Sequence, residues 1–168
     1  MKFFIVCFGV LFSINLYSQF VLPTNNYNKG LILFNSQNYD SAIVVMNKVI
    51  QEEPDSGRAY YIIGRCYQNM KEYKNAVDNY EIAISKGKKS SRVYFAQAFC
   101  YDELKQYDKA LIAYSNAIRL TPTYAQAYYN RGLIKYNIGK TDEACSDFKK
   151  AYQYGYTDAG KLIKENCN

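Results

Sequence analysis

Apolar and aromatic side chains recur every three or four residues along most of this chain, the spacing that gathers them on one face of an α-helix. Within residues 57–90 this spacing occurs twice, and the two sets are separated by the polar pair Lys71-Glu72, which we interpret as a turn. The first set is Tyr60, Ile63, Gly64 and Tyr67, and the second is Ala76, Tyr80 and Ala83. The pattern therefore predicts two antiparallel helices, whose small residues let the backbones approach closely.

The same pair of helices is predicted four times, because the pattern repeats every 34 residues without an insertion or a deletion. Small residues mark this period at three places: Gly30, Gly64, Ala98 and Gly132; Ala42, Ala76, Ala110 and Ala144; Val49, Ala83, Ala117 and Ala151. A constant period of this length predicts a helical solenoid, in which each unit buries its apolar face against its neighbours.

Each unit resembles the tetratricopeptide repeat (TPR) pattern, with an aromatic residue at place 4, small residues at places 8, 20 and 27, and proline at place 32, counted from the first residue of the unit. The units are residues 23–56, 57–90, 91–124 and 125–158. The departures are Asn26 for the first aromatic residue, Lys88 for a proline, and Lys135 for the tyrosine of the middle units. The resemblance implies an all-α fold, a right-handed TPR superhelix of antiparallel helix pairs.

The two ends of the chain follow other patterns. Residues 158–168 predict a C-terminal capping helix, with Thr157 as its N-cap and with Leu162 and Ile163 covering the apolar end of the last unit. Residues 1–18 have the layout of a signal peptide, with Lys2 before an apolar run and cleavage after Ser18. An uncleaved anchor is the alternative, but the run of about 14 residues is short for a membrane span of about 20. We predict an exported protein, periplasmic or secreted, without a membrane span in the mature chain.

The cysteines of the mature chain form two groups. Cys66 and Cys100 share place 10, so a helix-to-helix step of about 8–10 Å separates them, whereas a disulfide needs Cα atoms within about 7 Å. We expect both to be reduced core thiols. Cys145 and Cys167 are a candidate disulfide if the capping helix runs antiparallel to the last helix of the fourth unit; both remaining free is the alternative.

Residue composition argues against catalysis. The chain has no histidine, which removes the commonest general base and metal ligand, and it lacks a Cys-x-x-Cys motif, a phosphate-binding glycine loop and a serine elbow. We therefore expect no enzyme activity, no cofactor and no metal. The net charge of +6 is modest and its basic residues are scattered, which makes nucleic acid a poor partner.

A binding surface is the remaining prediction. In TPR-like solenoids the first helix of each unit lines a concave groove, chiefly through places 2, 5, 9, 12 and 13. Carried onto this chain, these places give an aromatic row with a central basic patch. The candidate groove residues are Tyr27, Arg58, Tyr61, Arg65, Arg92, Phe95, Phe99, Tyr129, Leu133 and Tyr136. Aromatic residues and arginine carry much of the binding energy in protein interfaces.

The resemblance implies a non-catalytic adaptor that binds an extended peptide or a partner helix, with the arginines favouring an acidic or carboxylate-bearing ligand. The partner is a protein or peptide of unknown identity, and the chain itself is a monomer or weakly self-associating. One alternative is that the place-5 aromatic residues only pack adjacent helices together. Others are a structural component of an envelope assembly and a module that binds envelope glycans. The lysine at place 5 and asparagine at place 9 of TPR clamps are absent, so binding of acidic C-termini in that manner is not supported.

Overall fold

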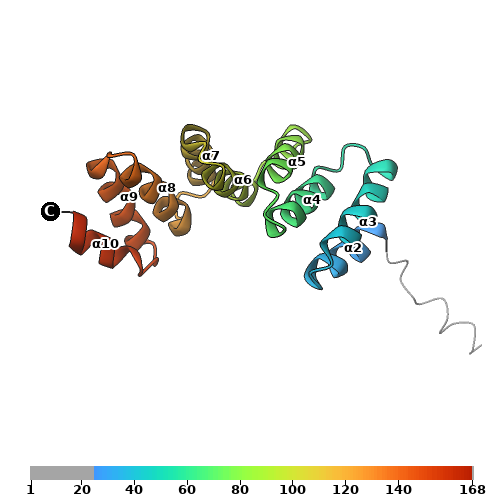
Figure 1. The fold of residues 1–168 in the computed structure, drawn as a ribbon, viewed down its shortest axis with the longest axis horizontal. Helices are drawn as coiled ribbons and strands as arrows, with labels where there is room; N and C mark the ends of the chain where they lie inside the picture. The colour runs from blue at the N-terminus through green and yellow to red at the C-terminus, as the bar shows by residue number, and fades with distance from the viewer. Residues whose placement is uncertain (1–24, 168) are drawn as a thin grey trace, which may run out of the picture.

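The computed structural model describes residues 25–167, and the predicted signal peptide, residues 1–18, lies outside them. The described residues form nine α-helices and no strand, labelled as in Figure 1. The helices are α2 (Asn26–Asn35), α3 (Tyr39–Glu52), α4 (Gly57–Asn69), α5 (Tyr73–Ser85), α6 (Ser91–Glu103), α7 (Tyr107–Leu120), α8 (Ala125–Asn137), α9 (Thr141–Gln153) and α10 (Ala159–Asn166).

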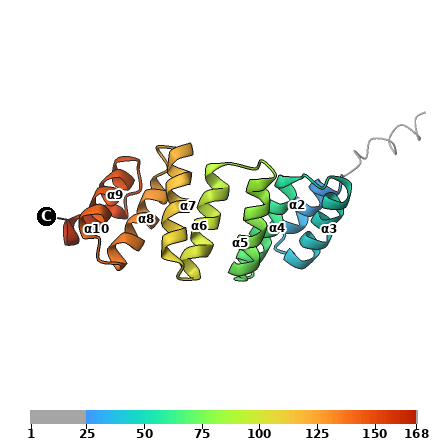
Figure 2. The same ribbon diagram turned by 90° about the horizontal axis from the view of Figure 1, so that it is seen from above.

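Consecutive helices form pairs that follow one another along the longest axis of the molecule, from α2 at one end to α10 at the other (Figure 1). The most extensive contacts are within the pairs α2/α3, α4/α5, α6/α7 and α8/α9, followed by those between one pair and the next. Figure 2 shows the same order from above. The prediction of an all-α superhelix of antiparallel helix pairs is confirmed.

Each pair is held together by a small residue of its first helix facing a large buried side chain of its second. A Cβ atom at Gly64 would lie 2.7 Å from Cε1 of Tyr80, and one at Gly132 would lie 2.7 Å from Cε1 of Phe148. The side chains at this place in the four second helices are all fully buried: Met46, Tyr80, Tyr114 and Phe148. The 34-residue period of small residues thus reflects the close approach of two backbones within every pair.

The turns inside the pairs repeat as well. Gln37, Lys71, Lys105 and Gly139 have φ angles of 61°, 63°, 60° and 82°, the left-handed region that ends many helices. In each turn the following amide donates to a carbonyl of the preceding helix, as from Glu72 N to Tyr67 O at 2.9 Å. Only the last of the four turns uses glycine, so the other three place an ordinary side chain in this less favourable region.

The C-terminal helix α10 packs against the last pair. Leu162 and Ile163 contact the cluster that contains Phe148 and Ala151, as expected for a cap. The expected N-cap Thr157 is wrong, because α10 begins at Ala159 with Asp158 before it. The Thr157 carbonyl instead accepts from the Gly160 amide at 2.9 Å and forms a tight turn ahead of the helix.

The four cysteines of the described residues form one disulfide and two free thiols. A disulfide joins Cys145 of α9 to Cys167 after α10, with the two Cα atoms 5.5 Å apart. Cys66 and Cys100 are free and buried, which confirms the expectation for that pair. Burial raises the pKa of the Cys66 thiol to about 11 and that of Cys100 to about 12, so both stay protonated at neutral pH.

Candidate functional site

The predicted groove residues all lie on the first helix of a pair, at equivalent turns of successive helices. Tyr27 is on α2. Arg58, Tyr61 and Arg65 are on α4, and the other candidates are on α6 and α8. Adjacent first helices touch one another from α2 to α4 and from α4 to α6. The residues at these places can therefore contact their counterparts in the neighbouring pair.

Two arginines of α4 lie over two aromatic rings of α2. The Cζ atom of Arg58 is 4.5 Å from the ring centre of Tyr27, and that of Arg65 is 4.6 Å from the ring centre of Phe34. Such cation–π contacts contribute about 0.5–1 kcal/mol each at exposed sites. Burial raises the pKa of the Tyr27 hydroxyl against the opposing effect of the Arg58 charge, so this ring stays neutral. The contacts hold both guanidinium groups in a defined orientation.

The charges of the groove arginines are satisfied to different degrees. Nη2 of Arg58 lies 3.2 Å from Oε2 of Glu53, which precedes α4 in the chain. Among residues 25–167 no carboxylate oxygen lies within 4.0 Å of Arg65 or of Arg92. Arg65 is half-buried against Phe34 and thus presents an unpaired cation on the first-helix side of the array.

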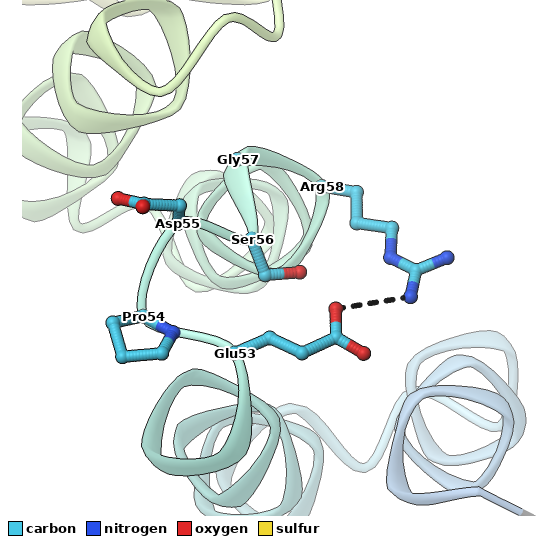
Figure 3. Close-up of a pocket in the computed structure, with 6 residues that line it drawn as sticks. All are labelled: Glu53, Pro54, Asp55, Ser56, Gly57 and Arg58. Atoms are coloured by element: carbon cyan, nitrogen blue, oxygen red, sulfur yellow. Dashed lines mark hydrogen bonds and ion pairs between the residues drawn. The ribbon is translucent and has the colours of Figure 1, made fainter.

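The turn between α3 and α4 forms an open hollow lined by residues 53–58 (Figure 3). The Glu53–Arg58 ion pair closes one side of it, and on the other side Asp55 pairs with Lys86, the residue after α5, at 2.5 Å. Ser56 is only 7 % exposed and its hydroxyl has no hydrogen-bond partner. In Figure 3 the Ser56 hydroxyl points toward the side on which Glu53 and Arg58 meet.

The aromatic row at place 5 is partly built into the packing between helices. The Tyr61 ring lies 5.9 Å from that of Tyr80, and the Phe95 ring stacks on Tyr124 at 5.0 Å. The Tyr129 ring lies 4.5 Å from that of Tyr156. These three rings and that of Tyr27, the fourth residue at place 5, are half-buried against the apolar clusters. The packing role left open by the sequence is therefore present, and ligand binding by these rings stays a prediction.

The candidates nearer the C-terminus differ in accessibility. Phe99 packs edge-on against Tyr73 at 6.1 Å between ring centres, and Leu133 belongs to the cluster beneath α10. Tyr136 is 40 % exposed, and its hydroxyl donates to Oδ1 of Asn166 at 2.8 Å. The capping helix thus reaches one of the predicted groove residues, so the groove and the cap are in direct contact at this end.

Sequence reasoning missed the residues that modulate these arginines. Phe34 occupies place 12, one of the groove-lining places, but the repeat did not indicate that its ring lies under Arg65. Glu53 and Ser56 lie in a turn, where no periodic signal indicates which way a side chain points. Their relation to Arg58 follows only from the path of the chain between α3 and α4.

A second polar feature is buried between α8 and α9. Arg131 donates to both carboxylate oxygens of Asp147, with Nε–Oδ2 at 2.9 Å and Nη2–Oδ1 at 2.6 Å. Nζ of Lys135 lies 3.0 Å from Oδ2 of Asp147 and 3.3 Å from Oε2 of Glu143. Lys135, which departs from the tyrosine of the repeat pattern, is thereby explained as a partner of these acids. The cluster is internally paired and joins α8 to α9.

The described part of the chain holds neither a metal-ligand cluster nor a membrane-spanning helix. Within residues 25–167 no group of three histidine, cysteine, aspartate or glutamate residues is arranged to hold a metal ion. Over the same residues no helix has the length and apolar character needed to cross a bilayer.

Comparisons with known proteins agree on the fold. The family model described as the tetratricopeptide repeat protein 21 C-terminal ARM domain matches residues 30–128, more than half of the chain, and a tetratricopeptide repeat model matches residues 113–146. No curated protein matches in sequence.

Several solved structures are similar in shape. The crystal structure of YrrB, a TPR protein with an unusual peptide-binding site, has a TM-score of 0.75 at 23 % identity over 94 % of this chain and 84 % of that one. A crystal structure of MamA has a TM-score of 0.72 at 22 % identity, covering 75 % of this chain and 74 % of that chain. MamA from Desulfovibrio magneticus RS-1 has a TM-score of 0.64 at 24 % identity, covering 85 % and 76 % respectively. At these identities the likeness shows the fold alone.

Proposed function

Because the chain belongs to the tetratricopeptide repeat family, we propose that it is a non-catalytic adaptor that binds an acidic peptide or partner helix along its first helices. Proteins of this fold generally serve as protein–protein interaction modules. What we propose beyond this is the location of the groove and the acidic nature of the ligand, and both are argued from the residues of this chain.

The observation that carries the proposal is the unpaired guanidinium of Arg65. Its stacking on Phe34 holds the group in one orientation, and no carboxylate among residues 25–167 lies within salt-bridge distance. Arginine in a fixed orientation binds a carboxylate through two parallel hydrogen bonds, which adds geometric specificity to the charge interaction. The aromatic rings nearby offer apolar contact area for neighbouring ligand residues.

One of the similar structures is compatible with this choice of ligand class. YrrB is a TPR protein with an unusual peptide-binding site. The low identity carries no residue across, so the chemistry of the ligand is argued from Arg58, Arg65 and Arg92 of this chain alone.

The test is recovery of a partner from the native envelope fraction on the tagged protein. We expect Arg65→Gln to lose a partner that the wild type retains, because glutamine keeps the polarity but not the charge. Arg119→Gln is the matched control, since Arg119 is exposed in the last turn of α7, which is a second helix of its pair. Replacing Tyr61 and Phe95 as well is less informative, because both rings also pack the core.

Retention of the same partner by wild type, Arg65→Gln and Arg119→Gln would contradict the groove as the binding site. Equal thermal unfolding curves for the two variants would show that loss of binding does not arise from loss of fold.

We also propose that the chain is exported and that residues 1–18 are removed, leaving a monomer or a weakly self-associating protein. N-terminal sequencing of the protein isolated from its native source is the direct measurement. We expect Gln19 as the first residue. A chain that begins at Met1 and fractionates with membranes would support the uncleaved anchor instead.

A further inference from the structure

Two arginines stack in the same way on aromatic rings of α2, but only one of them also pairs with a carboxylate. Both are on α4, seven residues apart, and their ring partners Tyr27 and Phe34 are also seven residues apart on α2. Seven residues of helix rise about 10 Å, so the two guanidinium groups are about that far apart along the helix. Arg65 has no carboxylate partner among the described residues, whereas Arg58 is paired with Glu53.

We propose that Glu53 occupies a ligand-binding position, and that a carboxylate of the bound partner replaces it at Arg58. The partner then carries two carboxylates about 10 Å apart, one bound by Arg65 and the other by Arg58. This inference rests on the proposed function and specifies which acidic segments the site selects.

Glu53 is well suited to be displaced. The side chains of Glu53 and Arg58 are 57 % and 46 % exposed, and exposed ion pairs of this kind contribute little to stability. Breaking the pair therefore costs little free energy when a ligand carboxylate binds, and Arg58 keeps its stacking contact with Tyr27.

A second observation at the hollow favours an anion there. The Ser56 hydroxyl is buried without a hydrogen-bond partner, and in Figure 3 it points toward the side where Glu53 meets Arg58. Ser56 also precedes the first turn of α4, whose partial positive charge favours an anion. A ligand carboxylate could thus accept from Ser56 Oγ and from Arg58 together, whereas Glu53 accepts from Arg58 alone.

The test uses two proline-rich peptides of equal length. The two-acid peptide carries glutamates three residues apart, which a polyproline II helix places on one side about 9 Å from each other. In the one-acid peptide the second glutamate is replaced by glutamine. Calorimetry measures both against wild type, Glu53→Gln, Glu52→Gln and Arg65→Gln.

Glu52→Gln is the matched control because it removes the same charge from the adjacent residue. Glu52 is exposed and accepts from Asn26 Nδ2 at 2.7 Å, whereas Arg58 donates to Glu53. We expect Glu53→Gln to bind the two-acid peptide about two to five times more tightly than Glu52→Gln does, the gain typical of one exposed charge pair. The one-acid peptide should bind these two variants equally, and Arg65→Gln should lose both peptides.

Equal affinities of Glu53→Gln and Glu52→Gln for the two-acid peptide would overturn the inference, since only the net charge would then matter. An equal gain for both peptides on Glu53→Gln would overturn it as well. Failure of either peptide to bind Glu53→Gln also counts against it. In that last case the proposed function still stands if the native partner is retained by the wild type and lost by Arg65→Gln.

Discussion

At the N-terminal end of the array, place 3 of the repeat holds the exposed Asn25, whereas the same place in the later units holds alanine or valine that is fully buried. Place 10 shows the same contrast. Ile32 is 59 % exposed, but Cys66, Cys100 and Ile134 are fully buried against the preceding pair. At place 3 the first pair thus has a polar residue instead of an apolar one, whereas at place 10 it keeps an apolar side chain, Ile32, that is exposed.

The C-terminal end meets water in a different manner. There α10 covers the apolar face of α8 and α9, with Ala159 fully buried and Leu162 and Ile163 packed against the last cluster. The disulfide between Cys145 and Cys167 ties down the far end of this helix.

The contrast shows that the same place in the repeat is buried in a unit where a neighbouring pair covers it and exposed where none does. A helical repeat cannot bury its apolar face alone, so each end needs its own solution.

The largest effect is expected from a substitution that breaks the charged cluster at the C-terminal end. Asp147→Ala would leave Arg131 and Lys135 buried without their shared carboxylate, at a cost of about 3–5 kcal/mol in the free energy of unfolding. Asn79→Ala is the control at the same place in the second unit, where the side chain only bonds to the Asn75 carbonyl at 2.8 Å. Urea unfolding of both variants measures the difference. Equal losses would mean that the cluster adds nothing to the C-terminal pairs.

Place 10 tests the contrast between the ends directly. Ile134→Ala should cost about 3–4 kcal/mol, because it opens a cavity in a fully buried site. Ile32→Ala, the same substitution at the exposed end, should change stability by about 0.5 kcal/mol or less. Thermal unfolding would report both. A large loss for Ile32→Ala would indicate that something covers this face.

Removing the disulfide should weaken the C-terminal end selectively. The double variant Cys145→Ser, Cys167→Ser opens a loop with a sequence separation of 22, which stabilises by about 3 kcal/mol in the chain-entropy model. Thiol labelling of the native wild type should modify no cysteine within residues 25–167, because Cys66 and Cys100 are buried and their raised pKa values keep them protonated.

Reductant should then expose two thiols, those of Cys145 and Cys167, without unfolding the first pairs. Four free thiols in denatured protein taken from its native compartment would show instead that the disulfide does not form there.

The smallest effect concerns close approach within the pairs. Gly64→Ala places a methyl group against the Tyr80 ring and the Ala76 carbonyl, which should cost about 1–3 kcal/mol. Gly30→Ala meets mainly the end of the flexible Met46 side chain at 2.6 Å, which can move aside. We expect the smaller loss at Gly30, measured by urea unfolding. The reverse order would mean that the second pair is the more adaptable.

Much of the fold was predictable because it repeats a local pattern. The place of Gly64 and of its counterparts indicated close helix pairs, and the period indicated how those pairs follow each other. The site was less predictable. The sequence placed Arg58 and Arg65 among the candidate residues, but it did not show that Glu53 pairs with one of them and that no described carboxylate pairs with the other.

The periodicity of the sequence by itself determined the helices, their pairing and the all-α class, because helical spacing and backbone approach depend on residues close in the chain. Only the tertiary structure decided which charges are paired and which places are buried. Phe34 and Arg65, like Arg131 and Asp147, belong to different helices, so their contacts depend on how those helices pack. The same place is buried in one unit and exposed in another because burial is a property of the neighbours rather than of the residue.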